Sequence, residues 1–599
     1  MRYLAFIGLL IIIVATAASI HRPQSFSEPV AQTKNYINRE TGLFAQTVVL
    51  LSQSIHELDV CRPASLVSAK SALKKCRLQY KKISFYLDYF YPQAGKLYNG
   101  PPKKELEEPF MEFEEPQGLQ QIESLLFGAH PENHQRELEN LVLILNESSH
   151  DLISVYQTIR TDPGQLMESL HLELIRIMSL YITGYDAPFL KSGVQESDMA
   201  LESVKSVIKF FLPFSNSKDR ALLKKIEKAQ QFLQLNNSFD AFNRLAFTTD
   251  YLLPLEAQLT QFIEENALAI STVANLDYHA INLYMHEVIV NRPVADEKMI
   301  SLGKMLFSET ALSGNGSRSC ASCHDPAKYF TDQLPQNISM DGSQKLKRNT
   351  QGLLYAAYQS TQFWDGRDST ASQQIHDVLT SKDEMNGSVA AIETRLNSSD
   401  NFRAIFRKAF QTANPDDRIG FQQIQTALSA YIRSLGLFNA AFDRFMSGDH
   451  NALTKQQQEG FNLFMGKAGC GTCHFAPVFN GSTPPFFNRS EYEVLGVPAP
   501  GDAGLKRLDP DLGRYNIYPV DIYRRAFKTP TVRNSAGTFP YMHNGSMKTL
   551  RAVVEFYNAG GGLGLGMPVP GQTLPEHRLH LSNSEINALV AFMEALTDE

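Results

Sequence analysis

Cysteine, tryptophan and runs of basic residues are scarce in this sequence of 599 residues. Six cysteines are too few for a dense disulfide framework, which excludes the class of small cross-linked secreted folds. A net charge of −7 without a basic cluster argues against nucleic acid as a partner. Strand-like alternation of apolar and polar residues is also rare. A chain of this length exceeds one hydrophobic core, so we expect several mainly helical domains.

Long apolar runs are missing except at the N-terminus, where Leu4–Ala18 is almost unbroken. The tripeptide Ala15-Thr16-Ala17 fits the small-residue cleavage site of a secretory signal peptide. We therefore predict a signal peptide over residues 1–19 and an exported mature chain. An uncleaved anchor is the alternative, because the run approaches the ~20 residues needed to span a bilayer.

Four of the six cysteines lie in two copies of the motif C-x-x-C-H, which are Cys320-Ala321-Ser322-Cys323-His324 and Cys470-Gly471-Thr472-Cys473-His474. In this motif the two thiols bond covalently to the haem vinyl groups, and the histidine becomes an axial iron ligand. The alternative for a single copy is a zinc knuckle or a reducible cysteine pair. Two copies among so few cysteines favour a protein with two c-type haems.

The other two cysteines, Cys61 and Cys76, permit two interpretations. On one continuous helix they would lie roughly 22 Å apart, which is beyond the reach of a disulfide. Pro63 is expected to break such a helix, so a bridge between two elements is one interpretation. Two buried free thiols are the other.

The composition changes along the chain. From about Ala31 to Ala274, apolar residues recur at helical spacing, most clearly in Ser65–Tyr89 and Pro131–Arg160, which predicts an antiparallel helix bundle. The segment Asn291–Val294 is typical of a linker, and glycine, asparagine and proline become frequent beyond it. We predict four regions, which are the signal peptide 1–19, a helical domain 20–284, and haem domains 285–447 and 448–599.

The two haem motifs are followed by the same order of features. An Arg-Asn pair comes first, at Arg348-Asn349 and Arg533-Asn534, and an aromatic turn ending in glycine follows, at Phe363–Gly366 and Tyr541–Gly545. This order predicts two duplicated cytochrome c-like domains, with their boundary near Ser447–Leu453.

Several longer segments resemble the bacterial diheme cytochrome c peroxidase and MauG family, over about 285–599. They are Leu302–Phe307, Arg348–Thr350, Gln362–Arg367, Asp383–Met385, Phe527–Asn534 and Pro540–Gly545. The order and spacing of these motifs agree with the family across both haem domains. The resemblance implies two cytochrome c-like domains with the active site at their interface.

The resemblance implies that His324 holds the reactive haem. Glu384 stands at the family position of the acid–base residue, and Gln374 matches a second position beside the bound peroxide. Trp364, the only tryptophan, falls at the position between the haems. His376 is nearby in sequence, but we expect a surface or packing role for it.

The coordination of the first haem stays open at this point. In classical family members a histidine in the loop after the first motif blocks the iron until the enzyme is reduced. The corresponding residues 337–342 contain no histidine. Either the iron is permanently open, as in the MauG branch, or Met340 takes the blocking position.

The second haem is implied to be held by His474 on one side. Tyr557 stands at the family position of the opposite axial ligand, and a phenolate there would lower the reduction potential. The alternative is that Tyr557 packs in the core and that Met542 or Met547 ligates the iron.

The family also holds a calcium ion between the haems. The matching positions are Asn349, which would offer its side chain, and Thr538 and Pro540, which would offer backbone carbonyls. Oxygen ligands of this kind suit a hard cation.

The predicted bundle carries a second, weaker resemblance. Gly118–Gly128 resembles the G-x-H-x-x-E segment of imelysin-like periplasmic domains, which are helical bundles. Gln120 stands where that family has histidine, which makes a metal site in this domain doubtful.

The resemblance implies a periplasmic peroxidase that reduces hydrogen peroxide to water, with electrons from a small donor such as a cytochrome c or a cupredoxin. Tyr557 and the missing histidine also suit a MauG-like oxidase that acts on a partner protein. A non-catalytic electron-transfer cytochrome is a third interpretation, and the resemblance leaves room for a homodimer.

Overall fold

The protein is described by a computed structural model that covers residues 26–59, 61–107, 112–216, 220–270, 296–412, 418–501 and 507–599. Helices dominate this part of the chain, and its two sheets have two strands each. The predicted signal peptide, the limit at 284/285 and the linker Asn291–Val294 lie outside the described residues. Among the described residues, no helix has the length and apolar character needed to cross a membrane.

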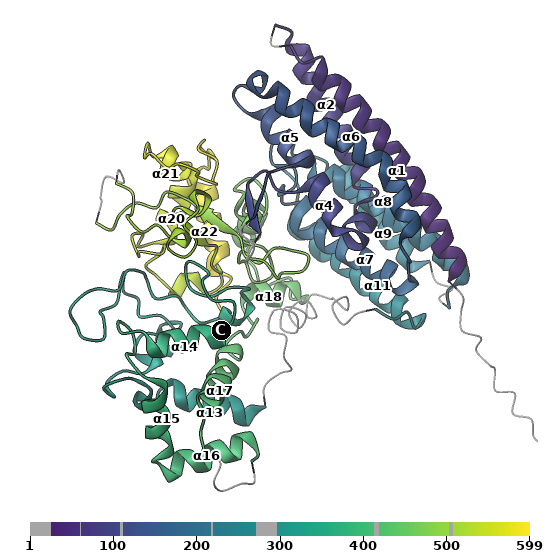
Figure 1. Cartoon of the computed structure of the whole chain (residues 1–599). Helices are drawn as coiled ribbons and strands as arrows, with labels where there is room; N and C mark the ends of the chain where they lie inside the picture. Colours follow the sequence, from purple (N-terminus) through teal and green to yellow (C-terminus); the bar gives the residue numbers. More distant parts are fainter. Residues whose placement is uncertain are drawn as a thin grey trace, which may run out of the picture.

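The N-terminal half is the predicted helical bundle, drawn in purple and blue in Figure 1. Its helices are α1 (Ser27–His56), α2 (Pro63–Tyr80), α3 (Ser84–Phe90), α4 (Pro92–Asn99), α5 (Gly118–Phe127), α6 (Gln135–Thr158), α7 (Pro163–Arg176), α8 (Gly193–Phe211), α9 (Ala221–Leu235), α10 (Arg244–Phe247) and α11 (Leu253–Glu265). The helix α1 packs against α2, α6 and α8, and it buries the apolar side of its length. An antiparallel hairpin, β1 (Glu105–Glu107) and β2 (Glu112–Glu114), lies between α4 and α5.

The expected helical segments of the bundle are confirmed with local changes. Ser65–Tyr89 divides into α2 and α3 at Lys81–Ile83, and Pro131–Arg160 contains α6. Asp162 precedes α7 and caps it, because its side chain accepts a hydrogen bond from the backbone N–H of Gly164.

Neither interpretation of the two isolated cysteines is right. Cys61 and Cys76 are both unbridged, Cys76 is buried, and Cys61 is exposed. Pro63 begins α2 instead of breaking a helix, since proline is well suited to the first helical turn. Cys61 therefore precedes the start of α2 while Cys76 lies in its last turns, roughly 20 Å further along.

The C-terminal half forms the two haem domains, coloured teal and green to yellow in Figure 1. The first contains α13 (Glu297–Phe307), α14 (Ala371–Thr380), α15 (Val389–Asn397), α16 (Asp400–Phe410) and α17 (Phe421–Arg433). The second contains α18 (Ala441–Met446), α19 (Lys455–Phe464), α20 (Leu550–Asn558), α21 (Gly561–Gly564), α22 (Asn583–Glu594) and an antiparallel pair, β3 (Tyr492–Val494) and β4 (Ala526–Lys528).

The two haem domains repeat one helix crossing. In the first, α13 crosses α17 at Gly303, where an added Cβ would lie 2.0 Å from the carbonyl oxygen of Ala427. In the second, α19 crosses α22 at Gly460, where an added Cβ would lie 2.0 Å from the carbonyl oxygen of Ala588. Only glycine permits backbones to approach so closely. The two haem domains therefore contain the same glycine-mediated helix contact, as the predicted duplication implies.

Helix α18 contributes side chains to the core of the second haem domain. Phe442, Phe445 and Met446 of α18 are buried in the core of the second haem domain, together with residues of α19 and α22. Helix α18 thus packs with α19 and α22, and the boundary near Ser447–Leu453 stays a prediction. The remaining domain limits stay predictions.

Candidate functional site

The first C-x-x-C-H motif folds as a short 3₁₀ turn over Cys320–Ser322. The ring Nδ1 of His324 lies 3.0 Å from the carbonyl oxygen of Phe330, and burial lowers the pKa of this imidazole. A neutral ring whose Nδ1–H is held by a carbonyl presents Nε2 for iron ligation. The motif therefore has the geometry that a haem attachment site requires.

The second motif repeats this arrangement over Cys470–Thr472. The Nδ1 of His474 lies 3.2 Å from the carbonyl oxygen of Phe479 and 3.0 Å from that of Pro530. Burial lowers the pKa of His474 to about 4, so the ring is neutral at physiological pH. As in the first motif, the hydrogen bonds to Nδ1 direct Nε2 toward an axial position.

The four thiols suit conversion to thioethers. Cys320, Cys323, Cys470 and Cys473 are all unbridged, although each pair has the spacing of a reducible disulfide. Burial raises the pKa of Cys320 and of Cys470 to about 12 and raises the pKa of the other two. The thiols are therefore uncharged where they lie, and thioether sulfurs, which also carry no charge, suit the same buried environment. The donor set and its burial both fit covalently attached haem.

Glu384 lies next to the first motif. Its carboxylate is close enough to Cys323 to act on it electrostatically, and its backbone carbonyl accepts a hydrogen bond of 3.2 Å from Arg318. Burial raises the pKa of the Glu384 carboxyl, while Arg367 and a hydrogen bond from Ser381 oppose that shift. A partly buried carboxyl with a raised pKa can both take and return a proton.

Other residues expected near the first haem lie on neighbouring elements. Gln374 lies half-buried on α14, and His376 is exposed on the same helix, with its ring edge-on to Phe421 at 5.7 Å. The backbone N–H of Met340 donates to the carbonyl oxygen of Asp383 at 2.7 Å, which ties the loop at 337–342 to the segment that bears Glu384. The ligand role of Met340 stays an open prediction.

Trp364 lies where the two haem domains meet. Its indole Nε1–H donates to the carbonyl oxygen of Asn349 at 2.9 Å, and its own carbonyl accepts from the backbone of Lys528 at 2.8 Å. The ring of His543, from the second haem domain, stands edge-on at 6.5 Å, and this histidine stacks on Phe527 at 3.8 Å. Trp364 thus adjoins the stacked rings of His543 and Phe527, which belong to the second haem domain.

Charged residues that hold the Trp364 turn are the main feature that the sequence did not indicate. Arg348 pairs with Asp365 at 2.6 Å and with Asp511 at 2.7 Å, and Arg514 donates to the carbonyl oxygen of Asp365 at 2.7 Å. Lys528 donates to the side chain of Gln359 and to a second carbonyl. The only signal was the position of Arg348 and Lys528 inside segments already noted for their resemblance to the family.

Tyr557 lies on α20 and faces the second motif. Burial raises the pKa of its phenol, and the nearby Cys473, Cys470 and Glu493 raise it further. The phenol is therefore protonated in this environment and would lose its proton on binding ferric iron. This location is compatible with an axial ligand, while the alternatives Met542 and Met547 stay untested.

The three residues of the expected calcium site belong to adjoining segments. The side-chain amide of Asn349 donates to the carbonyl oxygen of Leu334 at 2.8 Å, which leaves its oxygen for another partner. The backbone N–H of Asn349 donates to the carbonyl oxygen of His543 at 2.7 Å, and a Cβ added at Gly352 would lie 3.5 Å from the methyl carbon of Thr538. Pro540, which follows Thr538 closely in the sequence, is buried. Calcium binding by these residues stays a prediction.

A buried ionic cluster occupies the position expected for the imelysin-like motif. Gln120 donates to the carbonyl oxygen of Asn99 at 2.8 Å, and Glu123 lies 3.7 Å from Arg77. Arg77 pairs with Glu196 at 2.8 Å, so a guanidinium supplies the positive charge among these carboxylates. Among the described residues, no group of three or more histidine, cysteine or acidic side chains is arranged to hold a metal ion.

Comparisons with known proteins agree with the site. The profile of the family described as di-haem cytochrome c peroxidase matches residues 297–451. The cytochrome-c peroxidase IdrP2 of Denitromonas iodatirespirans is 36% identical over 317 residues, covering 50% of this chain and 82% of that protein. The methylamine utilization protein MauG of Methylorubrum extorquens is 35% identical over 309 residues, covering 51% of this chain and 80% of that protein.

Two further matches are a sequence relative and a solved structure. The cytochrome c551 peroxidase of Nitrosomonas europaea is 30% identical over 303 residues, covering 50% of this chain and 80% of that protein. A solved structure of a MauG-like protein associated with microbial copper homeostasis is 28% identical, with a TM-score of 0.44, and covers 52% of this chain and 92% of its own. On its haem motifs and on these sequence relatives, the chain belongs to the di-haem cytochrome c peroxidase family.

Proposed function

We propose that this protein is a periplasmic diheme peroxidase that reduces hydrogen peroxide to water with electrons from a small redox protein, a cytochrome c or a cupredoxin. The observation that carries the proposal is the location of Glu384, a partly buried carboxyl with a raised pKa beside the first haem motif. Its family membership and the relatives named as cytochrome-c peroxidases support the same activity.

The reaction consumes one peroxide, two electrons and two protons and yields two waters. Cys320, Cys323 and His324 would hold the haem whose iron binds peroxide when the group is attached. Glu384 would take the proton from one peroxide oxygen and return it to the leaving oxygen, and Gln374 would orient the peroxide by a hydrogen bond. A raised pKa suits Glu384 to this exchange, because the carboxyl must be a base in one step and an acid in the next.

The second haem would supply electrons through the contact between the haem domains. Cys470, Cys473, His474 and Tyr557 would hold it. Trp364 would carry electrons between the haems, since its ring adjoins aromatic side chains of the second haem domain. A calcium ion on Asn349, Thr538 and Pro540 would fasten the two domains beside this path.

Substitution of Glu384 by glutamine tests the catalytic assignment. Glu384→Gln keeps the shape of the side chain but removes the proton-accepting oxygen, so turnover of peroxide should fall by about 10²–10⁴-fold with both haems still attached. Asp383→Asn is the matched control, because Asp383 is the adjacent exposed carboxylate. Steady-state oxidation of a reduced cytochrome measures both variants. Activity retained in Glu384→Gln, or lost equally in the control, would remove Glu384 from the mechanism.

A MauG-like oxidase that acts on a partner protein is the second candidate function. The specific observation in its favour is the location of the Tyr557 phenol beside both thiols of the second motif. An anionic tyrosine ligand would lower the potential of that haem and disfavour electron uptake from a cytochrome. Slow turnover with reduced cytochrome, together with fast reaction of the fully oxidised protein with peroxide, would favour this candidate over the peroxidase.

A further inference from the structure

The helical bundle meets the second haem domain directly at the haem motif. The π-helical turn Ile177–Tyr181 contacts the 3₁₀ turn Cys470–Thr472, and the ring of Tyr185 stands edge-on to Phe475 at 5.6 Å. Phe475, which follows the proposed iron ligand His474, is buried in the core of the bundle. The haem motif and the bundle therefore share one packed interior.

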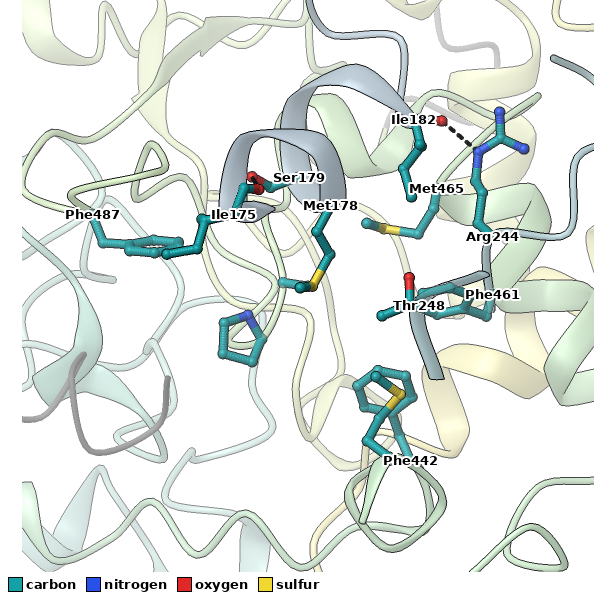
Figure 2. Close-up of a pocket in the computed structure, with 13 residues that line it drawn as sticks. Ile175, Met178, Ser179, Ile182, Arg244, Thr248, Phe442, Phe461, Met465 and Phe487 are labelled. Carbon is teal, nitrogen blue, oxygen red and sulfur yellow. Dashed lines mark hydrogen bonds between the residues drawn. The ribbon is translucent and has the colours of Figure 1, made fainter. Parts of the chain in front are cut away.

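The same contact is apolar over a wider area. Figure 2 shows a small cavity in which Ile175 and Met178 of the bundle face Phe461 and Met465 of the second haem domain. Close to it, the backbone N–H of Leu245 donates to the side chain of Asn462 at 3.0 Å. An apolar contact with satisfied polar groups at its edge is typical of a permanent interface.

Two carboxylates lie beside this interface next to the haem motif. A carboxylate oxygen of Glu493, on β3, lies 3.6 Å from the sulfur of Cys473. Glu491, which precedes β3, is buried and accepts a hydrogen bond of 3.4 Å from Thr483. Burial raises the pKa of Glu493, and Glu491 raises it further.

The positive charge that faces these carboxylates comes from the bundle. Lys103, two residues before the hairpin strand β1, forms an ion pair with Glu491 and also acts on Glu493 electrostatically. Figure 1 shows this hairpin on the side of the bundle that faces the second haem domain. The Lys103 side chain is 34% exposed and that of Glu491 is 10% exposed, so the pair lies at the edge of the interface.

We propose that the bundle is a fixed part of the second haem's environment, and that Lys103 raises the reduction potential of this haem by neutralising the carboxylates beside Cys473. The inference deepens the proposed function, because it rests on a haem attached at Cys470 and Cys473. Lys103 acts through Glu491 and Glu493 and is a positioning residue. The helical half of the chain thereby receives a role in electron transfer.

The direction of the effect follows from the charges. Ferric haem carries one more positive charge than ferrous haem, so unopposed carboxylates close to it stabilise the oxidised state and lower the potential. A lysine that pairs with those carboxylates cancels part of their field. Because Lys103 is partly exposed, salt should weaken its influence.

The test is a spectroelectrochemical titration of both haems in the full-length holoprotein. Lys103→Met should lower the potential of the second haem, leave that of the first unchanged, and show a larger shift at low ionic strength. Lys103→Arg keeps the positive charge, so the second haem of this variant should have the wild-type potential. Lys104→Met is the matched control, because Lys104 belongs to the same loop but pairs at 2.7 Å with Glu115 on the exposed surface.

A second variant distinguishes the proposed electrostatic effect from a simple loss of folding. Glu491→Gln removes a negative charge while Lys103 stays, so it should shift the second haem in the opposite direction, to higher potential. The proposal is overturned if Lys103→Met leaves the potential unchanged, if Lys104→Met shifts it equally, if both haems shift together, or if Glu491→Gln produces no rise. The titration uses no peroxide, so its failure would leave the proposed peroxidase activity standing.

Discussion

Lys528 carries its ammonium group into the contact between the two haem domains. Its side chain is 3% exposed, and its hydrogen-bond partners are the neutral oxygens of Gln359 and Thr361. Burial lowers the pKa of Lys528 to about 7, and Asp365 opposes that shift only in part. Lys528 therefore links β4 to the Trp364 turn. This contact costs free energy, because the amino group loses its hydration.

The free energy of unfolding should depend on pH through Lys528. Between about pH 7 and 10.5 the unfolded chain binds a proton at this lysine that the folded protein does not bind, so stability rises with pH in that window. The slope is about 1.4 kcal/mol per pH unit, and the contribution is constant below pH 7. Denaturant unfolding of the wild type and of Lys528→Met from pH 6 to 9 measures it.

The wild type should gain stability relative to Lys528→Met as the pH rises above 7. Lys548→Met, at an exposed lysine of the same domain, should show no such trend. A difference between the wild type and Lys528→Met that stays constant with pH would show that the lysine is charged throughout.

At the scale of single elements, the crossings of α13 with α17 and of α19 with α22 show how the haem domains are built. Gly303 and Gly460 stand at the contact points, and each faces a backbone carbonyl of the opposite helix. Gly303 belongs to a segment already noted in the sequence, whereas Gly460 had no such signal. The crossing itself could not be predicted, because the carbonyls of Ala427 and Ala588 belong to helices far away along the chain.

Alanine at either crossing should destabilise its own haem domain. The added methyl group would overlap the facing carbonyl and force the helices apart, at a cost of about 1–3 kcal/mol or more. Thermal unfolding of Gly303→Ala and Gly460→Ala should show lower midpoints. Gly42→Ala, in the interior of α1 with no atom within 4 Å of the new Cβ, should instead stabilise slightly. Unchanged midpoints in both crossing variants would contradict this prediction, because they would mean that the helices can move apart at little cost in free energy.

The elements also show where local patterns suffice. Helical spacing located the bundle, because the apolar face of a helix is set by residues three and four positions apart in the sequence. Pro63 was misjudged, since a proline that starts a helix and one that breaks it look alike until the helix start is known. The two haem motifs were recognisable because all their chemistry lies within five consecutive residues.

At the scale of the whole molecule, the helical bundle and the two haem domains meet at one junction. Leu172 and Ile175 of the bundle pack with Tyr355 of the first haem domain and Val478 of the second. Arg533, buried beside this junction, pairs with Asp443 at 2.6 Å and lies over the ring of Tyr355. The junction places the bundle against both haem domains, so it is more than an appended tail.

This arrangement could not be predicted from the sequence. Lys103 and Glu491 are separated by 388 positions, and an ion pair over that distance leaves no periodicity or motif in either segment. The resemblance to the diheme peroxidase family covered only the haem domains, and the relatives match about half of the chain. The role of the bundle therefore had to be inferred from its contacts.

The electron paramagnetic resonance spectrum of the resting, fully oxidised protein tests whether the iron of the first haem can bind peroxide. We predict a high-spin ferric signal from the haem on His324, as expected for an iron open to peroxide, beside a low-spin signal from the haem held by His474 and Tyr557. Two low-spin signals without a high-spin component would mean that both irons have two protein ligands, and they would contradict a resting peroxidase site at the first haem.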